Sequence, residues 1–191
     1  MNIVVRTASG KCIVRPDTTW EKDNENFFPP EFVNSISWSP VLFARISKPG
    51  RSVGEKFAGR YYDEVNYGVL LFPDDMMDGS EDGYAFASCL DHTSFLPSPG
   101  FSKDILDKGA EFILNLRKSG SDEVLFRHHE ADDLMIRAAI AEMTRFVYIR
   151  TGDLLAIELQ PRKPLCMRSD TDICLTGTYG GTETTGFRII F

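Results

Sequence analysis

The chain has 191 residues, of which 42% are hydrophobic and 26% are charged. This composition is typical of a folded globular protein, and the length favours a single domain over residues 1–191. The formal net charge is -7, and the Lys and Arg residues are scattered rather than gathered in one stripe. A negative chain without a basic stripe repels phosphate backbones, so we expect no nucleic-acid partner.

The apolar runs are too short for a membrane helix. Those at 68–72 and 154–159 fall far below the ~20 residues that a span requires. Residues 1–6 are typical of a first strand and lack the basic and then apolar pattern of a signal peptide. We therefore expect no membrane span and a cytoplasmic protein.

Residues 1–40 are expected to form an irregular N-terminal segment packed on a core at 41–191. Prolines lie among Asp, Asn and Glu between residues 15 and 40, and this composition breaks regular structure. Aromatic residues make the same stretch too apolar for a free linker, and they are Trp20, Phe27, Phe28, Phe32 and Trp38. We expect them to pack on the core or against another subunit.

Short runs rich in Val, Ile, Leu, Phe and Tyr predict strands, because Gly, Pro, Asp and Ser clusters separate them. These runs are 41–46, 65–72, 84–90, 112–117, 123–127, 154–159, 172–176 and 187–191. Polar residues at 118–122 predict a hairpin turn. Apolar residues recur every three or four positions in 132–148, which predicts the principal helix, and a shorter helix is expected at 102–108. The predicted fold class is mixed, β-rich α+β.

The second half of the chain has a distinctive order of segments. A long helix precedes Gly152-Asp153 and two apolar residues, and the polar turn at 170–172 and a final strand follow. This order resembles the C-terminal domain of the fumarylacetoacetate hydrolase family, from about residue 40 onward. The resemblance implies sheets with one principal helix and a homodimer. It also implies oxo-acid substrates, with Mg or Mn polarising a substrate carbonyl.

Two segments of the resemblance concern the substrate. Residues 40–49 are similar to a family segment whose lysine helps to receive the acidic group of the substrate, and Lys48 is the matching position. A solvated lysine before a proline turn is the alternative interpretation of Lys48. Residues 157–160 stand in the place of the family's TGTP loop and do not match it, which implies a changed substrate-binding loop.

Residues 62–72 resemble the family strand that carries two metal-ligating glutamates. Residues two apart in a strand lie on one face, so the family's pair can bind one hard cation. Gly68 and Leu70 stand at the two glutamate positions and offer no ligand. Glu64 and Asn66 share that face and could substitute through a register shift, although a polar strand edge explains them as well.

A third family ligand ends a neighbouring strand, and residues 83–92 resemble its surroundings. Cys89 stands at the place of the ligating aspartate, and Asp91 lies two residues further on, on the same face of a strand. His92 is the general acid and base candidate, because an imidazole pKa can lie near neutrality. The positions expected to line the family-like pocket are Lys48, Gly68, Leu70 and Cys89. A metal is expected only if Asp91 and Glu64 rebuild the site.

Two classes of function follow from these residues. The first is a divergent fumarylacetoacetate hydrolase-like protein that lacks the family's metal-dependent activity, needs no cofactor, and binds a small molecule such as an oxo-acid or another protein. The alternative is a Mg- or Mn-dependent hydrolase, decarboxylase or isomerase of oxo-acids with a site rearranged around Lys48, Asp91 and Glu64. The missing carboxylate pair favours the first class.

Three other groups of residues have simpler explanations. His128 and His129 point apart on a strand, so with Glu130 they favour a solvated helix start over a metal site. The loop at 177–181 lacks the lysine and following helix of a phosphate loop, which favours a hairpin. The acidic loop at 74–82 lacks the ordered ligands of a calcium loop.

Overall fold

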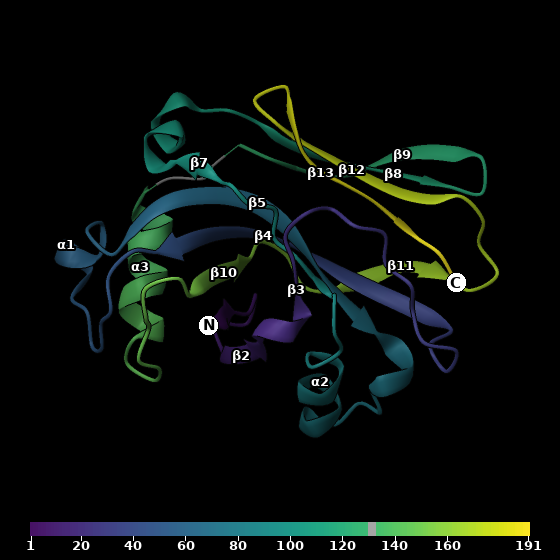
Figure 1. Ribbon diagram of the computed structural model, residues 1–191, viewed down its shortest axis with the longest axis horizontal. Helices are drawn as coiled ribbons and strands as arrows, with labels where there is room; N and C mark the ends of the chain where they lie inside the picture. Colours follow the sequence, from purple (N-terminus) through teal and green to yellow (C-terminus); the bar gives the residue numbers. More distant parts are fainter. Residues whose placement is uncertain (130–132) are drawn as a thin grey trace.

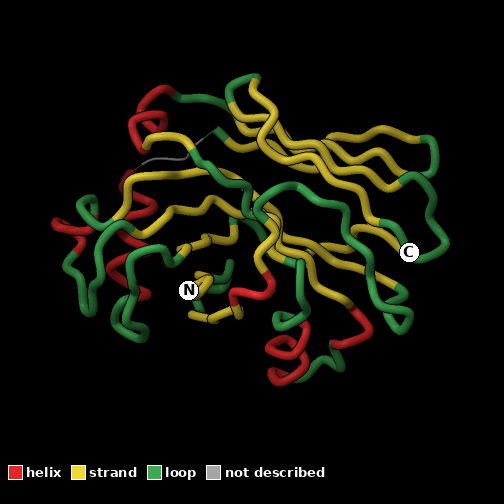
Figure 2. The backbone as a smooth tube through the Cα atoms, in the orientation of Figure 1, coloured by secondary structure: helices red, strands yellow, loops and turns green. Residues whose placement is uncertain are grey.

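The computed structural model describes residues 1–129 and 133–191. The helix start predicted at Asp132 and the interpretation of Glu130 lie outside the described residues. Strands are the main regular structure of the described chain, and the helices lie at its periphery (Figure 2). The structure confirms the predicted β-rich α+β fold class.

A large mixed sheet forms the body of the protein. Its strands follow the order β2-β1-β10-β4-β5-β6-β3, with β11 beside β4 and β7 beside β5. Their bounds are β1 Asn2–Arg6, β2 Cys12–Pro16, β3 Trp20–Glu21, β4 Ser35–Ile46, β5 Tyr62–Pro73, β6 Ser94–Phe95, β7 Phe101–Ser102, β10 Leu154–Glu158 and β11 Lys163–Met167. Strands β4 and β5 pair antiparallel along their length and cross the middle of the molecule as long curved strands (Figure 1).

A second sheet, in the order β13-β12-β8-β9, lies over one face of β4 and β5 (Figure 1). The strands of this second sheet are β8 Phe112–Lys118, β9 Ser121–His128, β12 Ile173–Tyr179 and β13 Thr182–Ile189. The Tyr67 ring of β5 stacks on the Phe112 ring of β8 with their centroids 4.3 Å apart. Aromatic contact therefore joins the two sheets.

The helices cover the ends of this arrangement. They are α1 Glu55–Ala58, α2 Glu81–Ala87 and α3 Asp133–Met143, with short 3-10 turns η1 Asp17–Thr19, η2 Asp74–Met76 and η3 Lys103–Lys108. Helix α3 buries Ile136, Ala139, Ile140 and Met143 in the same cluster that contains Tyr67 and Phe112. The amphipathic pattern at 132–148 therefore predicted the principal helix correctly over its described part.

The opposite face of β4 and β5 is covered by the N-terminal strands and α2. Its buried cluster includes Ile3, Val41, Phe43, Leu70 and Phe72. Both faces of β5 are therefore core. This explains why the second half of β5, residues 67–72, is a continuous apolar run and does not alternate with polar residues.

The predicted irregular segment at 15–40 is wrong at both ends. Strands β2 and β3 occupy its start, and β4 begins at Ser35. Pro40 is accommodated because it lies opposite a gap between two strands that pair with β4. The pairing of β10 with β4 ends at Val41, and the pairing of β11 with β4 begins at Trp38. The Pro40 carbonyl accepts from the Leu159 N–H at 3.0 Å, and no described strand there needs the N–H that proline lacks.

The strand predicted at 84–90 is also wrong, because residues 81–87 form α2. The Ser80 side chain caps this helix by accepting from the Gly83 N–H at 2.9 Å. A capping serine followed by acidic residues marks a helix start, and this signal outweighs the apolar run. Cys89 and Asp91 therefore follow a helix and do not alternate along a strand.

The two predicted turns are hairpins. Ser119 and Gly120, both with positive φ, join β8 to β9, and Gly180 and Gly181 join β12 to β13. The hairpin interpretation of the glycine-rich loop at 177–181 is thereby confirmed. Strand β12 extends further than the strand predicted at 172–176, because it continues to Tyr179.

The aromatic residues before β4 divide into two groups. Phe27 is buried, which confirms its predicted packing on the core, whereas Phe28 and Phe32 are 65% and 56% exposed. A homodimer that would cover these two rings stays a prediction. Among the described helices, none is long and apolar enough to cross a membrane.

Candidate functional site

The β5 positions that resemble the family's glutamate pair lie in a closed part of the core. Gly68 and Leu70 share one face of β5, and Leu70 is fully buried. A Cβ on Gly68 would collide with the Phe95 carbonyl oxygen and would lie 2.8 Å from Leu96 Cδ2. Residues 95 and 96 therefore fill the space in which a metal-ligating side chain would stand.

Glu64 and Asn66 lie on the same face further along β5. The Glu64 carboxylate is 3.6 Å from Nη1 of Arg45. Asn66 is 2% exposed, and its Oδ1 accepts from the Tyr67 N–H at 2.8 Å while its Nδ2 lies 3.4 Å from the Pro97 carbonyl. One carboxylate beside an arginine and one amide bonded to the backbone are a poor donor set for a divalent cation.

The other predicted pocket positions lie away from this face. Lys48 is exposed beyond the end of β4, seven residues along the chain from Val41, the β4 partner of Gly68. Cys89 is exposed after α2, and its thiol donates to a carbonyl of that helix at 3.3 Å. The structure therefore does not bring Lys48, Gly68, Leu70 and Cys89 around one cavity.

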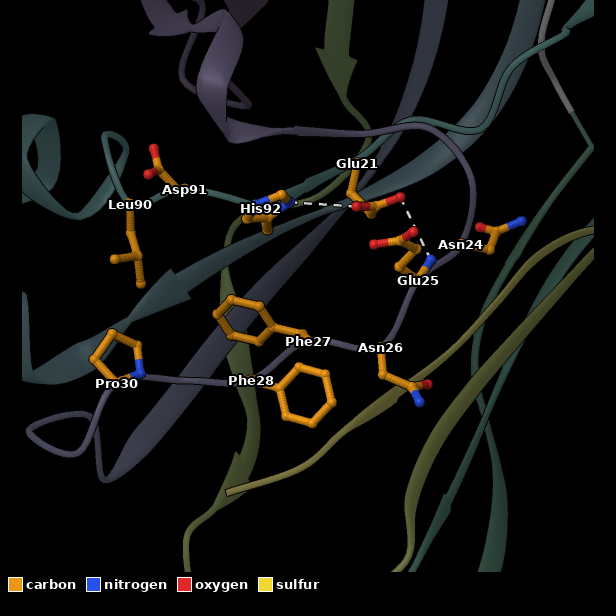
Figure 3. Close-up of a pocket in the computed structure, with 10 residues that line it drawn as sticks. All are labelled: Glu21, Asn24, Glu25, Asn26, Phe27, Phe28, Pro30, Leu90, Asp91 and His92. Carbon is orange, nitrogen blue, oxygen red and sulfur yellow. Dashed lines mark hydrogen bonds and ion pairs between the residues drawn. The ribbon is translucent and has the colours of Figure 1, made fainter.

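His92 and Asp91 line a cavity of about 690 Å³. Its walls come from residues 21–30 and from residues 90–92, which follow α2 (Figure 3). Strand β3 runs parallel to β6 and pairs Glu21 with Phe95. This pairing places Glu21 beside His92, although 71 residues separate the two in the sequence.

Glu21 and His92 form the polar centre of the cavity wall. The Glu21 side chain is 7% exposed, and its Oε2 lies 3.3 Å from Nδ1 of His92. Its Oε1 accepts from the N–H groups of Asp23 and Glu25 at 2.9 and 3.4 Å. His92 has a φ of 57°, and its N–H donates to the Thr18 carbonyl at 3.2 Å. The backbone thus holds the imidazole against Glu21 in a conformation that few side chains adopt.

The cavity is acidic on one side and aromatic on another. Glu21, Glu25 and Asp91 contribute carboxylates, and Phe27 and Phe28 contribute rings (Figure 3). No Lys or Arg is among its described lining residues. The wall therefore favours positive charge in the cavity.

Asn24 adds an unused acceptor to the same wall. Its Nδ2 donates to the Thr184 carbonyl at 3.1 Å, while its Oδ1 is buried and accepts no hydrogen bond from a described residue. A buried oxygen without a donor is costly unless a ligand or water donates to it. A ligand with an N–H group would supply that donor.

No family model matches the sequence, and no curated protein matches it. Solved structures do match. A candidate fumarylacetoacetate hydrolase family protein from Yersinia pestis CO92 gives a TM-score of 0.79 at 18% identity, over 99% of this chain and 92% of that chain. A candidate fumarylpyruvate hydrolase from Burkholderia cenocepacia gives a TM-score of 0.76 at 17% identity, over 99% of this chain and 88% of that chain. A fumarylpyruvate hydrolase from Pseudomonas aeruginosa, in complex with Mn²⁺ and pyruvate, gives a TM-score of 0.72 at 14% identity, over 95% of this chain and 78% of that chain.

The chain has the fumarylacetoacetate hydrolase fold. This confirms the fold that the segment order implied from the sequence. The shared architecture covers nearly the whole chain, including the residues before β4. At 14% to 18% identity the likeness establishes the fold alone.

The described residues do not fit the divalent metal that the fumarylacetoacetate hydrolase resemblance implies. Gly68 and Leu70 carry no oxygen ligand, and Asp91 lines a different cavity from the β5 face that carries Glu64. Within residues 1–129 and 133–191, no group of three or more His, Cys, Asp or Glu could hold a metal ion. The expectation that the protein needs no cofactor stays a prediction.

Sequence reasoning found His92 and Asp91 but missed Glu21 and Asn24. Glu21 reaches His92 only through the parallel pairing of β3 with β6, two strands of two residues each. Such short strands give no periodic signal. The available signal was compositional, since residues 20–28 combine acids and amides with three aromatic rings.

Proposed function

We propose that this protein is a divergent relative of the fumarylacetoacetate hydrolases that binds a small molecule and does not perform the family's metal-dependent chemistry. The packing of residues 95 and 96 above Gly68 supports the second part, because it leaves no room for a metal and a substrate there. The ligand would bind in the cavity of Glu21 and His92.

The observation that carries this proposal is the buried carboxylate of Glu21, fixed against His92 on the cavity wall. Together with Glu25 and Asp91 it attracts positive charge, and the faces of aromatic rings stabilise a cation. The unused Asn24 oxygen adds a site for an N–H donor. We therefore infer that the ligand is a small organic cation that bears N–H groups. An oxo-acid would be repelled by the same carboxylates.

Isothermal titration calorimetry with benzamidine tests this proposal. Benzamidine carries a positive charge and N–H donors on an aromatic ring, benzamide is its neutral counterpart, and benzoate is its negative counterpart. We expect benzamidine to bind with one site per chain and about tenfold more tightly than benzamide, because one charge-assisted hydrogen bond separates the two. Benzoate should give no measurable heat.

Two variants locate the binding. Glu21→Gln keeps the shape and the hydrogen bonds to Asp23 and Glu25 but removes the charge, so it should abolish the preference for benzamidine. Glu31→Gln removes an exposed charge from the same segment and should leave binding unchanged. Equal binding of benzamidine and benzoate, or benzamidine binding that survives Glu21→Gln, would refute the proposal.

A Mg- or Mn-dependent oxo-acid enzyme is the second candidate, because the Pseudomonas aeruginosa hydrolase of the same fold is in complex with Mn²⁺ and pyruvate. In this chain Glu64, Asp91 and Lys48 would have to supply the site. His92 would act as general acid and base, oriented by Glu21. Titration with a metal ion separates the two candidates.

A further inference from the structure

A second cavity, of about 720 Å³, lies between the β1–β2 hairpin, α2 and the end of β10. Its walls include residues 7–9 and 11–13, Tyr84 and Ala85 of α2, and Glu158, Pro161 and Arg162. It shares no described lining residue with the His92 cavity. An inference about it is therefore independent of the function proposed above.

Glu158 is the buried acid of this cavity, with 7% of its surface exposed. Its Oε1 accepts from the Tyr84 hydroxyl at 3.1 Å, and its Oε2 accepts from the Ala8 N–H at 3.0 Å. Burial raises the pKa of Glu158, while these hydrogen bonds and the charges of Arg15 and Arg162 oppose the rise. The carboxyl group is fixed in place, and a charge that enters the cavity would shift its proton equilibrium.

Positive groups outnumber this one acid. Arg15 lies behind the wall at 1% exposure, and Arg162 lies at the mouth with its guanidinium 5.8 Å from the ring centroids of Phe72 and Tyr84. Neither arginine forms an ion pair with a carboxylate in the described part of the chain. Lys11 lines the same cavity. The cavity is thus positive in a chain whose net charge is -7.

The other charged groups beside the cavity are occupied. Asp78 accepts from both the N–H and the hydroxyl of Ser80 on the loop before α2. Arg6 of β1 pairs with Glu142 of α3 at 2.6 Å. Arg162 Nη1 donates to Met77 Sδ at 2.7 Å, and a neutral thioether leaves the guanidinium charge open to an anion at the mouth.

The remaining wall has an apolar part, formed by Ala8, Ile13, Ala85, Pro161 and the ring of Tyr84. The small polar residues Thr7, Ser9 and Ser80 lie beside it. Burying an aromatic or branched group against the apolar part is favourable, whereas a fully polar ligand such as inorganic phosphate would leave it exposed to water.

We propose that this cavity binds a small organic anion with an apolar body, that Arg162 pairs with the anionic group, and that binding requires a protonated Glu158. An ionised Glu158 repels the anion, and the bound anion in turn favours the protonated carboxyl group. Binding therefore takes up a proton, so the affinity increases as the pH falls.

Titration calorimetry with benzenesulfonate tests this inference, because that probe keeps its charge between about pH 5.5 and about pH 8. We expect the native protein to bind it more tightly at the lower pH. Arg162→Gln should weaken binding about tenfold, as for a lost charge-assisted hydrogen bond. Glu158→Gln, which can still bond to Tyr84 and Ala8, should bind tightly at both pH values.

Lys163→Gln is the matched control, since it removes the same charge from the adjacent exposed residue outside the cavity. Circular dichroism checks that every variant is folded. The inference is wrong if the native protein does not bind benzenesulfonate, if Arg162→Gln and Lys163→Gln weaken binding equally, or if Glu158→Gln keeps the pH dependence. None of these results bears on benzamidine binding, which depends on Glu21.

Discussion

Gly68→Ala is expected to lower the free energy of unfolding by about 3 kcal/mol or more. The added methyl group would meet the Phe95 carbonyl oxygen, a main-chain atom that cannot rotate away, and the Leu96 side chain. Strand β5 cannot move aside, because Gly68 is paired with Val41 of β4. Urea unfolding followed by circular dichroism measures the loss.

Gly59→Ala is the control for this substitution. A Cβ on Gly59 would lie 3.6 Å from Arg137 Cδ, and the residue has a φ of -59° that alanine adopts readily. Its free energy of unfolding should stay within about 1 kcal/mol of the native value. If Gly68→Ala were as stable as Gly59→Ala, the face above Gly68 would be open, and a ligand could be placed there after all.

Arg15→Met should also cost about 3 kcal/mol or more of unfolding free energy. The guanidinium donates to the carbonyls of Ser88, Thr93 and Leu71 and to Oγ of Ser94, at 2.8 to 3.1 Å. Burial lowers the pKa of Arg15 to about 10, so the group is still charged at neutral pH. Methionine occupies a similar volume but removes all four of these hydrogen bonds. The Thr93 carbonyl would keep the Leu71 N–H and Ser94 Oγ would keep Thr19 Oγ1, whereas the Ser88 and Leu71 carbonyls would lose their guanidinium donor.

Two further variants frame this result. Arg15→Lys keeps the charge but cannot reach all four acceptors, so its loss should be intermediate. Arg51→Met removes an exposed arginine from the loop after β4 and should change the stability by no more than about 0.5 kcal/mol. Native stability in Arg15→Met would mean that an apolar residue replaces the buried cation at no cost, as happens for some buried charges.

The fold was predictable where local patterns are strong. The periodicity in 132–148 located α3, and the long apolar run at 65–72 located β5. Local patterns failed where strand pairing or a helix cap outside the apolar run decides the structure. Pro40 looked like a breaker because the sequence does not show the gap between β10 and β11 opposite it. Residues 84–90 looked like a strand because their apolar composition concealed the Ser80 cap.

The candidate site was predictable only in part, because its residues meet through distant pairings. His92 and Asp91 were identified from their chemistry, whereas Glu21 depends on β3 pairing with β6. Glu158 was visible as a charge inside an apolar run, but its partner Tyr84 lies 74 residues earlier and reaches it from α2. Side-chain chemistry can be recognised in a sequence, and the partner that orients it cannot.

The central claim is that this chain keeps the fumarylacetoacetate hydrolase fold while the β5 face has become core. Calorimetric titration of the chelator-treated protein with MnCl₂, repeated with Glu64→Gln and with Asp91→Ala, tests it most directly. We predict that all three proteins give the same small heats, without a site of one metal ion per chain. Stoichiometric Mn²⁺ binding in the native protein that either substitution abolishes would contradict the claim and establish a rebuilt metal site.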